Sequence, residues 1–298
     1  LVDFFVMVKL GQWAKRPFFT VTPALLVFFI LLTRWISKKL FFYIRCLVMR
    51  VTIMGSGTMV PSNERNSSGV LVEHENIFSM IDFGYGSMHN LLKKGLTYHD
   101  IDRIYFTHNH PDHICDLVPF LFASRYPQNP RIKDLEIVAA PGFKRFFDTL
   151  MQAYKNWLVP TTYKVKILEQ DEETKIYDGL IVISKKMKHI ELSRGYRFEL
   201  ADGKSLVISG DTDYCDGLID LGRETDLMIL ECSMPDNMKV QGHMTPSECG
   251  KLAQSANCRR LCLTHFYPVC EQNEVRAKCL AEYGGELFLA EDFMEFDF

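Results

Sequence analysis

Three histidines and an aspartate lie within six residues of one another, at His108, His110, Asp112 and His113. They follow an apolar run, residues 101–107, that predicts a β-strand, so a loop begins where these side chains gather. Neutral imidazole and carboxylate are good zinc ligands. The stretch therefore predicts a metal site, although it supplies too few ligands for two ions.

Three further candidate ligands occupy the same kind of position elsewhere in the chain. His189, Asp211 and His265 each come directly after, or one or two residues past, a run that predicts a strand. The remaining ligands of a two-metal centre should lie at strand ends, and randomly placed surface histidines would not follow this pattern. These three residues are therefore expected to complete the site.

The elements that must position these residues follow from short apolar runs bounded by Gly, Asn and Ser. Strands are predicted at 50–54, 69–73, 77–83, 101–107, 135–142, 163–169, 179–188, 195–200, 204–210, 226–231, 260–264 and 286–292. Helices are predicted at 87–94, at 116–126 with Asp116 as its N-cap, at 143–155, from Pro246 onward and at 273–283. This order favours one domain of two sheets sandwiched between helices.

Charge is distributed unevenly along the 298 residues, whose net charge is −3. The first 48 residues hold seven basic residues and one acid, which leaves 27 basic and 36 acidic residues, a net charge of −9, for the remaining 250. An acidic body argues against a broad nucleic-acid-binding face, because phosphate contacts are made mainly by Lys and Arg. A narrow basic patch stays open, and Lys185, Lys186, Lys188, Arg194 and Arg197 form one such concentration.

The N-terminal segment forms a separate unit in this interpretation, with residues 1–48 as a basic, apolar extension and residues 49–298 as the domain that holds the candidate ligands. Residues 18–33 carry no charge and are flanked by basic residues, close to the lower length limit of a membrane span. The extension could be a membrane anchor, or it could be absent from the native protein, since Met49 directly precedes the first predicted strand. No small-residue cleavage site supports a signal peptide.

Cysteine usage indicates the cellular compartment. The nine cysteines are an odd number and include no Cys-x-x-Cys pair. This pattern is typical of free thiols in a reducing compartment. We therefore expect a cytoplasmic protein, associated with a membrane if the extension is real.

The His-x-His-x-Asp-His stretch, with a later His, an Asp and a final His at strand ends, resembles the metallo-β-lactamase superfamily. Four further segments are similar to ribonuclease Z, the tRNA 3′-processing endonuclease. They are Pro61–Ser68, Gly195–Arg197, Ser209–Thr212 and Gly242–Thr245. The resemblance runs from about Arg50 to the C-terminus and implies an α+β four-layer αβ/βα sandwich, the metallo-β-lactamase fold.

The resemblance also implies a ligand set for two divalent ions, zinc or, alternatively, manganese. One ion would be held by His108, His110 and His189, the other by Asp112, His113 and His265, with Asp211 bridging them. A hydroxide between the two ions would be the nucleophile, because zinc-bound water can have its pKa lowered to about 7. Asp112 is also counted among the catalytic residues, and Asp82 would support the metal loop without binding metal.

His243 and Glu231 form a second group, for which the resemblance implies that His243, paired with Glu231, protonates the leaving oxygen. His243 lies two residues before Thr245–Glu248, a capping box with Pro at the first helical position, so its backbone is well placed. The alternative is that His243 only hydrogen-bonds its loop and that Glu231 merely ends a strand.

One departure from the ribonuclease Z pattern affects the expected substrate. Only 21 residues separate His189 from Asp211, which leaves no room for the long arm that grips tRNA in that family. We therefore expect a metal-dependent phosphodiesterase that acts on a small phosphodiester or an RNA 3′ end. The alternatives are a tRNA 3′-processing endonuclease, a hydrolase of a thioester or lactam, and a non-enzymatic binding protein. We further expect a homodimer, and membrane contact through residues 18–33.

Overall fold

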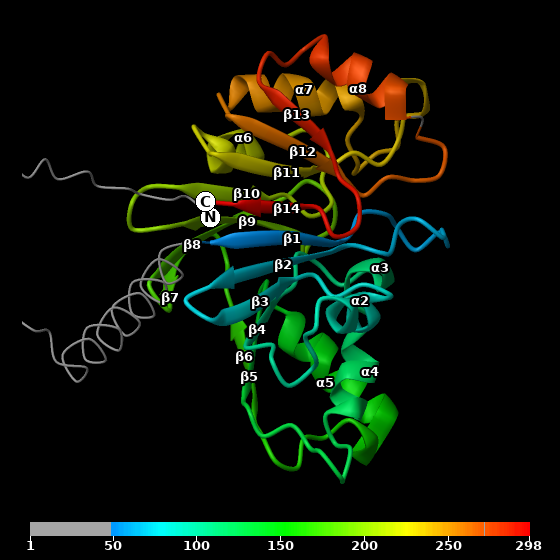
Figure 1. The fold of residues 1–298 in the computed structure, drawn as a ribbon, viewed down its shortest axis with the longest axis vertical. Coiled ribbons are helices and arrows are strands. Elements are labelled where there is room, and N and C mark those ends of the chain that lie inside the picture. Colours follow the sequence, from blue (N-terminus) through cyan, green and yellow to red (C-terminus); the bar gives the residue numbers. More distant parts are fainter. Residues whose placement is uncertain (1–48, 271) are drawn as a thin grey trace, which may run out of the picture. The chain divides into compact units, whose positions relative to one another are not determined.

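The computed structural model describes residues 49–270 and 272–298. These residues form two seven-stranded sheets with helices on their outer faces (Figure 1). The predicted extension, residues 1–48 with its apolar run 18–33, lies outside the described residues. In the described part, no helix is both long enough and apolar enough to cross a membrane.

The first sheet combines an antiparallel and a parallel half. In spatial order its strands are β14 (Glu295–Asp297), β1 (Arg50–Gly55), β2 (Gly69–His74), β3 (Ile77–Ile81), β4 (Arg103–Tyr105), β5 (Leu135–Ala139) and β6 (Val165–Glu169). Pairing is parallel from β3 to β6. The last strand lies against the first, because Arg50 pairs with Asp297 and the Phe298 N–H donates to the Met49 carbonyl.

The second sheet has the same mixed character. Its order is β13 (Glu286–Leu289), β12 (Arg260–Thr264), β11 (Leu227–Glu231), β10 (Ser205–Ile208), β9 (Arg194–Glu199), β8 (Leu180–Lys186) and β7 (Thr174–Tyr177). The strands β10 to β13 are parallel, so their carboxyl ends meet at one edge of the sheet. In open sheets of this kind, ligands bind outside the carboxyl ends of the parallel strands.

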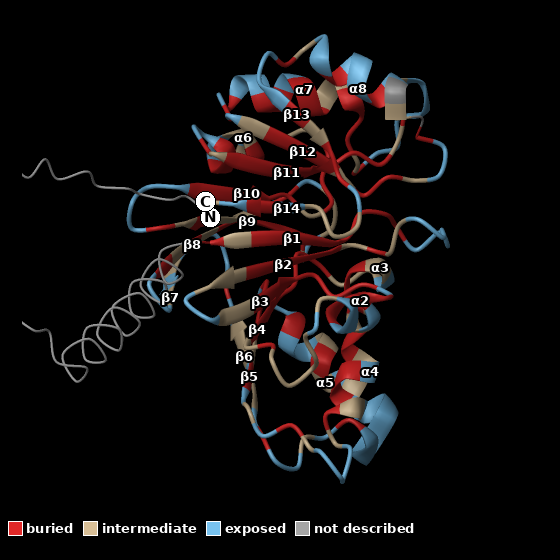
Figure 2. Cartoon of the chain, viewed as in Figure 1, coloured by how far each residue is buried: buried red, intermediate tan, exposed pale blue. Residues whose placement is uncertain are grey.

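Helices cover the outer face of each sheet. The first sheet is covered by α2 (Ser87–Lys93), α3 (Pro111–Ile114), α4 (Leu117–Ala123), α5 (Phe143–Tyr154) and η1 (Lys155–Trp157). The second is covered by α6 (Asp216–Gly222), η2 (Asp236–Met238), α7 (Pro246–Ser255) and α8 (Gln272–Leu280). Three buried apolar clusters fill the spaces between these layers, and the central strands are buried along most of their length, whereas the edge strands β6 and β7 are not (Figure 2). The predicted four-layer αβ/βα sandwich is confirmed.

Two local predictions differ from the structure. The strand predicted at 101–107 is paired only over Arg103–Tyr105, because the backbone from Phe106 onward turns into the histidine-rich loop. Asp116 does stand at the N-cap of α4, but its side chain does not cap that helix. Its Oδ2 instead accepts the backbone N–H of Met88 in α2, so it links two helices.

Candidate metal centre

The histidine-rich loop is held in place by Asp82, which follows β3. Asp82 has a left-handed backbone, with φ 60°, and is buried. Its carboxylate accepts the Thr107 N–H at 2.8 Å and the Thr107 hydroxyl at 2.8–3.0 Å. It also accepts the Nδ1–H of His113, which leaves the Nε2 lone pair of that ring for a ligand. This agrees with the predicted supporting role of Asp82.

All seven candidate ligands lie together at the carboxyl edge of the parallel strands. Their ligand atoms form two groups in which every atom lies within 4.8 Å of the others, namely His108, His110, His189 and Asp211, and then Asp112, His113 and His265. A third group that meets the same limit joins His243 to Asp211 and His265. The first comes from the loops after β4, β8 and β10, and the second from α3 and the end of β12.

Asp211 lies between the two groups and directs one carboxylate oxygen toward each. Its Oδ2 is 3.7 Å from Nε2 of His108 and 3.9 Å from Nε2 of His189. Its Oδ1 is 3.2 Å from Nε2 of His113 and 3.5 Å from Nε2 of His265. The two oxygens of this carboxylate thus face different groups of candidate ligands.

Two unpartnered atoms show that this cluster suits a cation. Nε2 of His108 and Oδ1 of Asp211 are buried without a hydrogen-bond partner, although a buried unpaired polar atom is costly. Burial lowers the pKa of His108 well below its ordinary value, so its ring is neutral, as a metal ligand must be. Burial alone would also lower the pKa of His113, but the carboxylates of Asp211 and Asp82 raise it well above its ordinary value. Positive charge is thus stabilised at this point.

His243 lies beside this cluster and contacts Glu231. Its Nδ1 is 3.1 Å from Oε1 of Glu231, which is almost fully buried at the end of β11. Its ring lies 4.8 Å from that of His189 and 6.0 Å from that of His265. With Nδ1 engaged, Nε2 is the atom that can exchange a proton with a substrate. Burial lowers the pKa of His243, but the hydrogen bond and charge of Glu231 outweigh it and raise the pKa above the ordinary value.

Ser233 joins the two parts of the site and was missed in the sequence. Its hydroxyl donates to Oε2 of Glu231 at 2.8 Å and lies 3.1 Å and 3.0 Å from Nδ1 of His243 and His265. Because the one hydroxyl proton goes to Glu231, the hydroxyl oxygen accepts the Nδ1–H of His265, which leaves Nε2 of that ring as its lone-pair nitrogen. The single Nδ1–H of His243 is shared between Glu231 and this hydroxyl oxygen. In the sequence, only its position two residues after Glu231, at the end of a predicted strand, could have pointed to Ser233.

The segment Pro61–Ser68 supports the site through contacts with the C-terminal part of the chain. The Arg65 guanidinium lies 5.0 Å from the centre of the Phe266 ring and donates to Ser56 Oγ. Asn66 donates its backbone N–H and its Nδ2–H to Oδ2 of Asp292, at 2.9 and 2.8 Å. Asp292 therefore fixes this loop beside His265.

Two cavities adjoin the candidate ligands. One, of about 520 Å³, is lined by Lys186, Lys188, His189, Asp213 and Gly242, among others. The other, of about 360 Å³, is lined by Phe266 and Tyr267, which follow His265, and by Arg65, which lies over the Phe266 ring.

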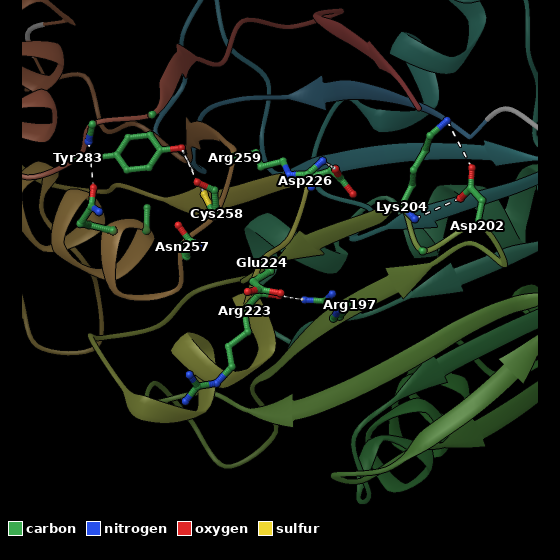
Figure 3. A pocket seen from close by; sticks show the side chains of 15 residues that line it. Arg197, Asp202, Lys204, Arg223, Glu224, Asp226, Asn257, Cys258, Arg259 and Tyr283 are labelled. Carbon is green, nitrogen blue, oxygen red and sulfur yellow. Dashed lines mark hydrogen bonds and ion pairs between the residues drawn. The ribbon is translucent and has the colours of Figure 1, made fainter.

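Arg194 and Arg197, predicted as part of a basic concentration near the site, do not face it. Arg194 is buried and donates to Asp171 and to the Glu191 carbonyl. Arg197 lines a cavity of about 940 Å³ with Lys204, Asp226 and Arg259, which stand at the starts of β10, β11 and β12 (Figure 3). That is the sheet edge opposite the candidate ligands, and the charged groups shown there, such as Arg259 and Asp226, pair with one another.

Comparison with known families and proteins gives a consistent result. The family described as the beta-lactamase superfamily domain matches residues 81–266, more than half of the chain. A ribonuclease Z of Brevibacillus brevis is 28% identical over 282 residues, covering 76% of this chain and 87% of that protein. A ribonuclease BN of Cronobacter sakazakii is 28% identical, covering 83% and 99%.

Solved structures show the same fold. The metallo-beta-lactamase fold protein YhfI of Bacillus subtilis superposes with a TM-score of 0.75 at 22% identity, covering 84% of this chain and all of that one. The short form of human tRNase Z superposes with a TM-score of 0.64 at 27% identity, covering 83% and 98%.

Proposed function

The chain belongs to the beta-lactamase superfamily and is a metal-dependent hydrolase, and from this premise we propose that it is a dinuclear phosphodiesterase similar to ribonuclease Z. The observation that carries the proposal is the position of Asp211, with one oxygen toward each ligand group. The His243–Glu231 pair beside it supplies a proton donor.

We propose that the cluster binds two zinc ions, with manganese as the alternative. His108, His110 and His189 would hold one ion, and Asp112, His113 and His265 the other, with Asp211 shared. Two bound cations would lower the pKa of a water molecule and neutralise charge on a phosphoryl oxygen. Around them, Asp82 and Ser233 orient His113 and His265 through their Nδ1–H groups.

The proton for the leaving oxygen would come from Nε2 of His243. Glu231 holds the ring by its Nδ1–H and stabilises the positive charge of the imidazolium. Glu231 is buried and accepts the backbone N–H and the hydroxyl of Ser233, which fixes the orientation of its carboxylate. A general acid of this kind contributes typically about 10²- to 10⁴-fold to the rate.

The proposed substrate is a small phosphodiester or an RNA 3′ end. The names of the ribonuclease Z and BN relatives support a phosphodiester, and the two cavities beside the cluster offer room on both sides of a scissile bond. The short segment between His189 and Asp211 contains only β9, β10 and their turn, which favours substrates that need no long gripping arm. The homodimer, the cytoplasmic location and membrane contact through residues 18–33 stay predictions.

The proposal predicts metal-dependent hydrolysis of bis-p-nitrophenyl phosphate. Purified protein should bind close to two equivalents of zinc or manganese, lose activity when a chelator removes them, and regain it when the metal is returned. Metal content measured by mass spectrometry, together with p-nitrophenolate release, checks this. Protein that binds no metal, or that hydrolyses the ester equally well without it, would contradict the proposal.

Processing of tRNA 3′ ends is the second candidate function, because several relatives carry the name ribonuclease Z. It predicts that a 3′-extended tRNA precursor is cut once, at the end of the acceptor stem, while a single-stranded RNA of the same length is cut poorly. Gel analysis at saturating metal separates the two candidates. Activity on bis-p-nitrophenyl phosphate without precursor cleavage would retire tRNA processing and keep the phosphodiesterase.

A further inference from the structure

Lys239 contacts three different segments around His243. Its ammonium group donates to Oδ1 of Asp213 at 2.7 Å, to Oε2 of Glu248 at 2.6 Å and to the backbone carbonyl of His243 at 2.5 Å. An ammonium has three N–H donors, so all three are used. The Lys239 side chain is 32% exposed, which makes it a partly sheltered charge at the rim of the site.

The contacted groups fix the chain on both sides of His243. Oδ2 of Asp213 accepts the Gly242 N–H, and the Gly242 carbonyl accepts the Nδ1–H of His189. Oε2 of Glu248 accepts the Thr245 N–H in the capping box that starts α7. Lys239 thus joins the segment that holds His189 and the helix start that follows His243.

The loop between η2 and α7 is anchored on one side of His243 by Met244, which is buried in the core. On the other side Val240 and Gln241 are exposed, so the contacts of the Lys239 ammonium group hold that part of the loop. Lys188 is the other lysine near Asp213, but its Nζ lies 3.9 Å from that carboxylate and its side chain is 63% exposed. Without Lys239, two carboxylates that now share one cation would face each other across the loop.

We propose that Lys239 is a positioning residue that holds His243 in the orientation for proton donation. The inference rests on the proposed phosphodiesterase function and extends it to a residue outside the ligand set. Lys239 acts through the backbone carbonyl of His243 and through the carboxylates of Asp213 and Glu248. It contacts neither the substrate nor the candidate ligands directly. A displacement of about 1 Å in a reacting group can cost about 10²-fold in rate.

The test is the dependence of the rate on the leaving group. Thymidine 5′-aryl phosphates, with phenols ranging from p-nitrophenol to unsubstituted phenol, need increasing help from a general acid. Lys239→Met should slow the phenyl ester about 10- to 100-fold and the p-nitrophenyl ester far less, which steepens the slope of log kcat against leaving-group pKa. Lys239→Arg, which keeps a cation, should recover most of the lost slope.

Two comparisons separate positioning from a general loss of stability. In the double variant with His243→Ala, the Lys239→Met change should add no further loss, since the group it positions is gone. Lys251→Met removes a lysine of α7 whose side chain is 58% exposed and whose Nζ is 3.7 Å from Glu282, and it should leave the slope unchanged. Lys239→Gln serves as a second variant if Lys239→Met folds poorly.

The inference is overturned if Lys239→Met slows every ester equally, if its loss adds fully to that of His243→Ala, or if Lys239→Arg recovers nothing. Failure of the underlying function looks different: the wild-type protein would then hydrolyse none of the esters, or would show a slope as steep as that of His243→Ala.

Discussion

Replacing Asp211 by alanine is expected to reduce phosphodiester hydrolysis by about 10³-fold or more and to lower the bound metal below two equivalents. Two bound ions stabilise the transition state by several kcal/mol, and each 1.36 kcal/mol is tenfold in rate. Asp211 is the residue whose carboxylate faces both ligand groups, so its loss should affect both ions. Steady-state rates and metal content, measured on the same samples, check this.

A matched control for this change is Asp220→Ala. Asp220 is exposed on α6 and pairs with Arg223 three residues away, a kind of contact worth about 0–1 kcal/mol. Its loss should change neither rate nor metal content. An Asp211→Ala protein that keeps two equivalents of metal and the wild-type rate would remove the basis of the dinuclear assignment.

Replacing His243 by alanine is expected to cost about 10²- to 10⁴-fold with phenyl or alkyl leaving groups and much less with p-nitrophenolate. A poor leaving oxygen needs a proton as the P–O bond breaks, whereas p-nitrophenolate is stable without one. Equal losses across the series would instead assign His243 a structural role. His89→Ala, at an exposed position of α2, is the matched control and should have no effect.

The wild-type protein and the His243→Ala variant should also differ in the pH dependence of their rates, which reports the titration of the general acid. Against the effect of burial, the hydrogen bond and charge of Glu231, which is not a candidate ligand, raise the pKa of His243 above its ordinary value. The acid form is therefore present below that raised pKa and is lost as pH rises through it. The ratio of wild-type to His243→Ala rates on a phenyl ester should be constant at low pH and fall above the pKa of His243, and a ratio that is flat with pH would contradict this.

The fold and the ligand candidates could be predicted because both follow from strand ends. Apolar runs locate the strands, and parallel strands such as β10 and β12 bring their carboxyl ends to one edge, so Asp211 and His265 lie together although they are distant in sequence. The capping box before α7 is likewise a local pattern, and it placed the start of that helix correctly.

The supporting contacts could not be predicted, because they join loops without periodic patterns. Ser233 and Lys239 lie in such a loop, and their partners come from segments that only the folded chain brings near. For Arg197, closeness in sequence wrongly predicted closeness in the folded chain. It lies eight residues past His189 in sequence, but β9 carries it away from the candidate ligands, so that its guanidinium reaches the carbonyls of Leu221 and Arg223 at the far edge of the sheet.

The contact of Asn66 with Asp292 has a consequence for the order in which the chain folds. During synthesis, the loop of Arg65 and Asn66 emerges long before Asp292, and β1 emerges long before its partner β14. Until Asp292 and β14 have been made, β1 presents an unpaired edge and the loop beside His265 lacks its anchor. The candidate metal centre therefore depends on contacts between the earliest and the latest strands of the domain, so it can be completed only after β14 has folded against β1.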